Sequence, residues 1–150
     1  MGHAYLHSIK SEKNDSNVIG DLSDNNQKPV LCLDFDGVLH WYRQGWKKPT
    51  VIDDIPVPGA QEFVNKAAKH FRVVVFSSRG NYTGGVDAIK NWLQKNNFPV
   101  VEVVTRKPVS HVALDDRSVT FTGKWPEPSE LLKFQPWNRK AQRKIKTLLR

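Results

Sequence analysis

The sequence predicts an α/β protein with a parallel sheet and helices packed on its faces. Short apolar runs of the kind expected for strands buried on both faces recur between residues 30 and 116. Segments with apolar residues at helical spacing lie between the first three of these runs. The alternation of strand and helix favours a parallel sheet, and a chain of 150 residues is long enough for one domain with its own core.

The apolar runs and the amphipathic segments give the expected elements in order. Strands are predicted over 30–34 (VLCLD), 72–78 (RVVVFSS), 100–104 (VVEVV) and 111–116 (HVALDD). A first helix is predicted over 58–70, with Pro58 near its start. A second is predicted over 84–97, where Val86, Ile89 and Leu93 follow helical spacing. These elements occupy the predicted central domain, residues 29–135.

The two ends of the chain differ from the central domain in composition. Residues 1–28 are polar and predict a flexible tail. Residues 136–150 contain six Lys or Arg and no acidic residue, and Trp137, Ala141, Ile145 and Leu149 recur every four positions. This pattern predicts a basic amphipathic helix. Two interpretations remain open: the helix packs on the domain through its apolar stripe, or it is an arm that binds nucleic acid.

Composition also bears on the compartment. No apolar run approaches the roughly 20 residues that span a bilayer, and the first residues lack the apolar segment of a secretory signal. The single cysteine, Cys32, cannot form an internal disulfide and is predicted to be a buried core residue. We therefore expect a cytoplasmic protein that is not inserted in a membrane.

Polar residues with chemical potential follow the predicted strands. In an open parallel sheet, ligands bind at the carboxyl ends of the strands, so these residues are expected to meet at one edge. The set comprises Asp34, Asp36, Ser77, Ser78, Asp115 and Asp116 at strand ends, with Lys107 in the connection before the fourth strand. Taken alone, Asp34 and Asp36 are also compatible with a strand that ends in a polar Asp-Gly turn.

Several carboxylates at one edge repel one another unless a cation lies between them. Oxygen ligands suit Mg²⁺, and the sequence has no Cys/His cluster with zinc spacing. A cation would also favour the ionised form of Asp34 and leave it available as a nucleophile. Lys107 and the Ser77 hydroxyl could hold phosphoryl oxygens, and phosphoryl transfer depends mainly on such positioning and charge neutralisation.

The same residues resemble the motifs of the haloacid dehalogenase (HAD) superfamily of phosphohydrolases. "DFDGV", a strand ending in Ser, a Lys and "LDD" occur in the family's order between Val30 and Thr122. The resemblance implies a Rossmann-like three-layer α/β/α sandwich with a central parallel sheet. It also implies that Asp34 forms an aspartyl-phosphate, and that Asp36 acts as general acid and then general base while its backbone carbonyl binds Mg²⁺.

The remaining motif residues receive roles from the same resemblance. Ser77, in preference to Ser78, hydrogen-bonds the phosphoryl group, and Lys107 neutralises charge on the intermediate. Asp115 and Asp116 complete the Mg²⁺ site; Asp116 is expected to ligate directly, and which of the two touches the metal stays open.

A narrower resemblance concerns three arginines. Arg79, Arg106 and Arg117 lie beside the second, third and fourth motifs, as in the 3′-phosphatase domain of phage polynucleotide kinase–phosphatases and in small HAD proteins of phages and bacteria. The resemblance implies that these arginines serve the active site, and we expect them, together with Ser78, to bind substrate. Surface ion pairs are the alternative.

The spacing of the motifs leaves no room for a cap domain. Residues 40–57 suffice for a β-hairpin flap, whose Trp41, Tyr42 and Trp46 either stack on a base or pack on the core. An open site favours large phosphorylated substrates such as a polynucleotide 3′-phosphate. We therefore expect a Mg²⁺-dependent phosphatase; the alternative is a nucleic-acid- or protein-binding module that keeps the fold with little or no turnover.

Overall fold

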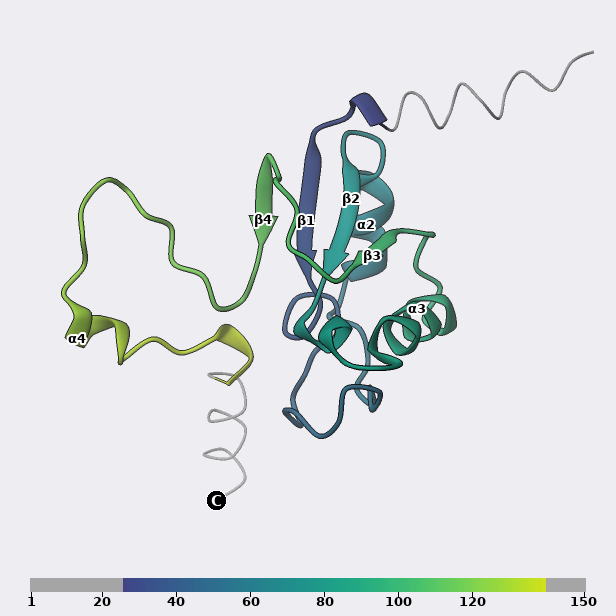
Figure 1. Ribbon diagram of the computed structural model, residues 1–150, viewed down its shortest axis with the longest axis horizontal. Helices are drawn as coiled ribbons and strands as arrows, with labels where there is room; N and C mark the ends of the chain where they lie inside the picture. Colours follow the sequence, from purple (N-terminus) through teal and green to yellow (C-terminus); the bar gives the residue numbers. More distant parts are fainter. Residues whose placement is uncertain (1–25, 140–150) are drawn as a thin grey trace, which may run out of the picture.

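The computed structural model describes residues 26–139 and contains a parallel sheet with helices packed against it (Figure 1). The sheet has four strands in the order β3-β2-β1-β4. These are β1 (Val30–Asp34), β2 (Arg72–Phe76), β3 (Glu102–Val104) and β4 (Val112–Leu114). The predicted α/β class with a parallel sheet is confirmed, although the last three strands are shorter than predicted.

The register of the strands determines which residues leave the sheet side by side. In the pairing of β1 with β4, Leu33 lies opposite Leu114, so Asp34 and Asp115 are the next residues on the two neighbouring strands. In the pairing of β1 with β2, Asp34 lies opposite Phe76, and Ser77 follows it directly. The carboxyl end of the sheet therefore gathers the strand-end residues from β1, β2 and β4.

Two helices cover one face of the sheet. These are α2 (Ala60–Ala67) and α3 (Gly85–Lys95), both shorter than predicted at each end. Each belongs to a crossover that moves in the same direction along the sheet, and right-handed crossovers in one direction place their helices on one face. The side chains in this shared core include Leu31, Leu33, Val73 and Val75 from the strands with Val64, Ile89 and Trp92 from the helices.

The opposite face carries Cys32 and Val74, which are both buried. The connection from β3 to β4 must cross β2 and β1 to reach the far edge, and Figure 1 shows its course. Lys107 on this connection lies near enough to Cys32 for its charge to act on the thiol. The connection contains no helix, so it does not supply the second helical layer that a three-layer sandwich requires.

The segment between β1 and α2 is a loop. The sequence predicted that residues 40–57 have room for a β-hairpin flap. In the structure only the two ends of this segment pair, at one isolated antiparallel bridge between His40 and Pro56, and no strand forms. Trp46 in the loop stacks on the Arg79 guanidinium, 4.7 Å from its ring centroid. Through this contact the loop packs against Arg79, which follows β2.

After β4 the chain leaves the sheet. Residues 117–134 are exposed and include the short helix α4 (Pro128–Leu131), and Figure 1 shows this stretch extending away from the sheet. Residues 137–139 are helical, where the basic helix was predicted to begin. The predicted tail over 1–28 and the rest of the helix over 136–150 lie largely outside the described residues. Between residues 26 and 139, no helix is long and apolar enough to cross a membrane.

Candidate active site

Three carboxylates meet at the carboxyl end of the sheet. Ligand oxygens of Asp34, Asp115 and Asp116 all lie within 4.8 Å of one another. Asp34 ends β1, and the other two follow β4, so the parallel pairing of these strands brings the three together. The sequence predicted this grouping, and the structure places all three residues as expected; we call them the carboxylate cluster.

The surroundings of the carboxylate cluster disfavour the ionised forms of Asp34 and Asp116. Burial raises the pKa of Asp34 to about 7; the backbone N–H of Phe35 lowers it, and the neighbouring Asp115, Asp116 and Asp36 raise it further. Burial also raises the pKa of Asp116, which Arg117 opposes. The energetic cost of ionising the cluster falls if a cation binds among its oxygens.

The donor set fits a hard divalent cation. All three residues offer carboxylate oxygens, which Mg²⁺ prefers over nitrogen or sulfur. Within the described part of the chain, Asp116 Oδ1 is buried and has no hydrogen-bond partner. A buried carboxylate oxygen without a donor is costly, and a metal ion would satisfy it. The residues present therefore fit the predicted Mg²⁺.

Asp36 lies outside the carboxylate cluster and is held by two basic side chains. Arg79 Nε and one terminal nitrogen donate to its two oxygens at 2.7 and 3.1 Å, and His40 Nδ1 lies 2.8 Å from Oδ1. The backbone N–H of Asp54 donates to His40 Nε2 at 3.2 Å. Since Nε2 accepts this bond, the imidazole proton is assigned to Nδ1, which donates to Asp36.

Arg79 occupies a different position from that of a substrate-binding side chain. The residue is 0% exposed. Besides Asp36, its guanidinium donates to the backbone carbonyls of Lys48, Pro49 and Val51 at 2.9–3.1 Å. Its nitrogens are therefore satisfied by the protein, and its evident contact with the site is through Asp36. Neither direct substrate contact nor a surface ion pair describes this geometry.

Ser77 and Ser78 both follow the end of β2, but they differ in burial. Ser77 is 2% exposed and its Oγ accepts a hydrogen bond from the Arg79 backbone N–H at 3.2 Å, whereas Ser78 is exposed. The predicted strand over 72–78 ends early because Ser77 caps the short 3₁₀ helix η1 (Ser78–Asn81). The predicted phosphoryl contact of Ser77 stays a prediction.

Of the basic residues predicted at the site, some lie beside the carboxylate cluster and one does not. Lys107 Nζ lies 3.7 Å from Asp115 Oδ2. The backbone N–H of Arg117 donates to Asp115 Oδ1 at 2.8 Å, and its charge acts on Asp116. Arg106 is exposed, and the structure gives it no contact with the cluster within residues 26–139. Lys107 and Arg117 are thus beside the cluster, while a role for Arg106 rests on the resemblance alone.

Three neighbours of the site were not predicted from the sequence. His40 follows Asp36 by four residues, which was a usable signal. Gly37 adopts a positive φ of 88° and packs against Asp116. Trp137 Nε1 donates to the Gly37 carbonyl at 2.7 Å across 100 positions of sequence, and no local pattern could have revealed that contact.

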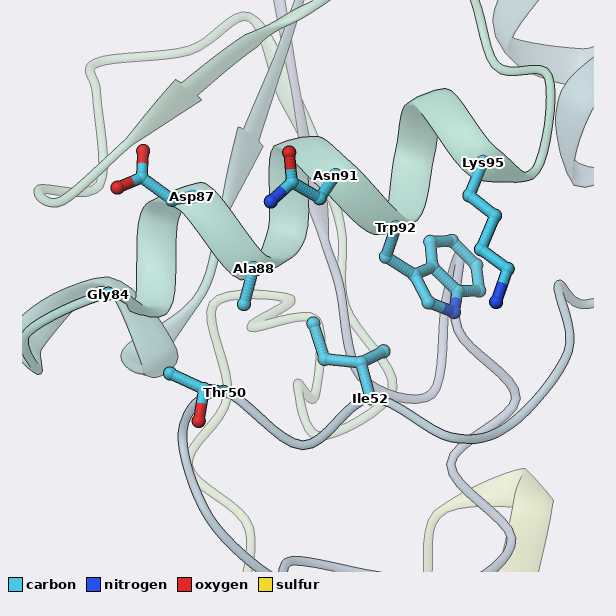
Figure 2. Close-up of a pocket in the computed structure, with 8 residues that line it drawn as sticks. All are labelled: Thr50, Ile52, Gly84, Asp87, Ala88, Asn91, Trp92 and Lys95. Carbon is cyan, nitrogen blue, oxygen red and sulfur yellow. The ribbon is translucent and has the colours of Figure 1, made fainter.

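A separate pocket of about 430 Å³ lies between α3 and the loop at Thr50 and Ile52 (Figure 2). Asp87, Asn91 and Lys95 succeed one another along the helix beside it. None of the predicted site residues lines this pocket, so the carboxylate cluster is a distinct feature at the sheet edge.

Comparison of the chain with models of protein families, with curated proteins and with solved structures finds no match.

Proposed function

We propose that this chain is a Mg²⁺-dependent phosphatase with a HAD-like fold that hydrolyses phosphomonoesters through an aspartyl-phosphate on Asp34. The observation that carries the proposal is the convergence of Asp34, Asp115 and Asp116 within 4.8 Å at the ends of β1 and β4. The motif order in the sequence supports the assignment of separate roles to these residues.

The proposed chemistry has two displacements at phosphorus. Asp34 attacks the phosphorus, the ester oxygen leaves with a proton from Asp36, and an aspartyl-phosphate forms. Asp36 then takes a proton from water, which attacks the same phosphorus and releases phosphate and free Asp34. The carboxylate cluster would hold Mg²⁺, which supplies positive charge to neutralise the phosphoryl oxygens. Lys107 is placed beside the cluster to neutralise further charge.

The contacts of Asp36 suit a group that must be aimed accurately. Arg79 binds it at two points, and His40 donates to one of its oxygens. A fixed orientation matters because a general acid or base must lie within hydrogen-bond reach of the proton that it transfers. In this proposal Arg79 and His40 are positioning residues, and they act through Asp36.

A large substrate, such as the phosphorylated end of a polynucleotide, is the finer part of the proposal. Between β1 and α2 the chain forms a loop that folds back on Arg79. Lys107 and Arg117 add positive charge at the sheet edge. The sequence of residues 136–150 contains six more Lys or Arg. Positive charge near a phosphatase site favours a substrate that carries several phosphates.

The test compares hydrolysis of p-nitrophenyl phosphate by the wild type, Asp34→Asn and Asp87→Asn, each with Mg²⁺ and with EDTA. Asp87 is an exposed residue of α3 and gives a matched control for the same chemical change. We expect Mg²⁺-dependent turnover that Asp34→Asn abolishes and Asp87→Asn preserves. A wild type inactive with every divalent ion would overturn the proposal and favour a binding module that keeps the fold without turnover.

A further inference from the structure

After the exposed stretch 117–134, the chain contacts the body of the domain again at residues 136–138, where a helical segment begins. Pro136 and Asn138 are buried, and Asn138 is 2% exposed. Between them, Trp137 donates its indole N–H to the Gly37 carbonyl at 2.7 Å. Pro136 and Asn138 are therefore packed against the domain, whereas Trp137 is 42% exposed and contacts the domain through this hydrogen bond. We call residues 136–138 the C-terminal anchor.

The C-terminal anchor contacts Gly37, the residue that packs against Asp116 of the carboxylate cluster. A Cβ added to Gly37 would lie 2.3 Å from Asp116 Oδ2, so the glycine backbone is in close contact with that carboxylate. Gly37 also follows Asp36 directly, and its own N–H donates to the His40 carbonyl at 2.8 Å. A shift of Gly37 would therefore move both Asp116 and the backbone beside Asp36.

From within the turn, Gly37 is held by backbone hydrogen bonds: its N–H donates to the His40 carbonyl, and the N–H groups of residues 38–40 donate to the Phe35 carbonyl. The Gly37 φ of 88° lies in the left-handed region, where glycine is flexible. The Asp116 carboxylate feels repulsion from Asp115 and Asp36, and its Oδ1 has no hydrogen-bond partner within residues 26–139. The Trp137 indole, which comes from a different part of the chain, holds the Gly37 carbonyl by its hydrogen bond. It therefore restrains the position of Gly37, against which Asp116 packs.

We propose that Trp137 is a positioning residue of the divalent-cation site, and that the C-terminal anchor forms one wall of that site within the same chain. The proposal rests on the cation site in the proposed function but not on phosphatase turnover. Groups that orient the ligands of a metal without touching it typically contribute 10–100-fold to affinity or activity. The indole N–H acts in this way through Gly37 on Asp116.

The test measures cation affinity directly, with Mn²⁺ as the probe and free Mn²⁺ followed by electron paramagnetic resonance. Trp137→Phe keeps an aromatic ring but removes the donor. We expect Mn²⁺ to bind at least about tenfold more weakly to this variant. Trp125→Phe is the matched control, because Trp125 is an exposed residue of the extended stretch, and its affinity should equal that of the wild type. Equal affinities for Trp137→Phe and the wild type would overturn the proposal.

A second variant separates the hydrogen bond from simple packing. Trp137→His is smaller than Phe but retains a ring N–H. We expect it to bind Mn²⁺ more tightly than Trp137→Phe, whereas a purely structural role predicts that the smaller, more polar ring is no better. If Trp137→His binds Mn²⁺ no more tightly than Trp137→Phe, the proposed role of the indole N–H donor is overturned. A wild type that binds Mn²⁺ without hydrolysing any phosphomonoester would instead refute the proposed function and leave this inference standing.

Discussion

Arg79 and Asp36 form a two-point ion pair, with Arg79 Nε 2.7 Å from Oδ2 and a terminal nitrogen 3.1 Å from Oδ1. The exposed fraction of the arginine side chain is 1%, and that of the aspartate is 13%. The same guanidinium binds three carbonyls of the loop between β1 and α2. One side chain thus joins the end of β2, the proposed general acid and the loop beside it.

This pairing predicts that Arg79→Lys slows hydrolysis although it conserves charge. A lysine has three donors on one nitrogen and cannot reproduce the planar fork that binds both oxygens of Asp36. We expect a loss of up to the roughly 10²–10⁴-fold that general acid–base catalysis contributes. The loss should be larger for an alkyl phosphate than for p-nitrophenyl phosphate, whose leaving group needs less protonation.

The measurement is kcat for both substrates, with thermal melting to confirm that Arg79→Lys is folded at the assay temperature. Asp36→Asn provides the comparison, because it should show the same dependence on leaving group. If Arg79→Lys reduces kcat equally for both substrates, Arg79 does not act through the acid role of Asp36.

The carboxylate cluster predicts how stability responds to pH without a cation. The pKa of Asp34 is raised from 3.8 to about 7, so the folded state binds a proton more tightly than the unfolded state does. Between these two values the folded protein holds more protons, and its free energy of unfolding falls as pH rises. The raised pKa of Asp116 acts in the same direction.

We therefore expect the melting temperature in EDTA to fall as pH rises from about 4 to about 7, where Asp34 becomes ionised. In Asp34→Asn the slope should be smaller, because this residue no longer titrates. Added Mg²⁺ should raise the melting temperature more at pH 8 than at pH 5, since a cation binds the ionised cluster. The experiment is a set of melting curves on the wild type and Asp34→Asn over this pH range. If the melting temperatures of the two proteins depend on pH with identical slopes, Asp34 is not the group that titrates.

Local sequence patterns predicted the parallel sheet because each buried strand is a short continuous apolar run. They also predicted the carboxylate cluster, since parallel strands bring their carboxyl ends to one edge. They did not predict the irregular loop after β1, whose course depends on a buried arginine that binds its carbonyls. Nor could they predict Trp137 at Gly37, a contact of single residues far apart in the sequence.

The close packing of Gly37 predicts a specific loss in Gly37→Ala. The new Cβ would lie 2.3 Å from Asp116 Oδ2, and the residue would keep a φ of 88°. Non-glycine residues in such strained conformations cost about 1–3 kcal/mol. We expect reduced stability and, because Asp116 is displaced, weaker activation by Mg²⁺.

Gly123→Ala is a closely matched control, with a φ of 89° and no atom near the added Cβ. It should show backbone strain without any effect on the Mg²⁺ dependence of activity. Melting curves and Mg²⁺ titrations of both variants test this difference. An equal Mg²⁺ dependence in the two variants would show that contact with Asp116 is unimportant.

The basic residues after the C-terminal anchor predict a salt-dependent interaction with nucleic acid. Arg139 acts electrostatically on Tyr42, in the loop that follows Asp36, so the charged segment begins near the site. Residues 140–150 contain five further Lys or Arg and no acidic residue. Replacing these five by Gln retains Trp137 and the apolar residues of the stripe, and it removes charge alone.

We expect this five-residue variant to bind a phosphorylated oligonucleotide more weakly, with a smaller salt dependence, while p-nitrophenyl phosphate hydrolysis and the melting temperature stay unchanged. For every phosphate that the variant no longer neutralises, the slope of log K against log salt should become shallower by about 0.7 for a single strand. The stripe interpretation is tested separately by Ile145→Asp, which should lower the melting temperature if the apolar face packs on the domain. Unchanged oligonucleotide binding in the Gln variant would contradict the nucleic-acid arm, and an unchanged melting temperature in Ile145→Asp would contradict the packed stripe.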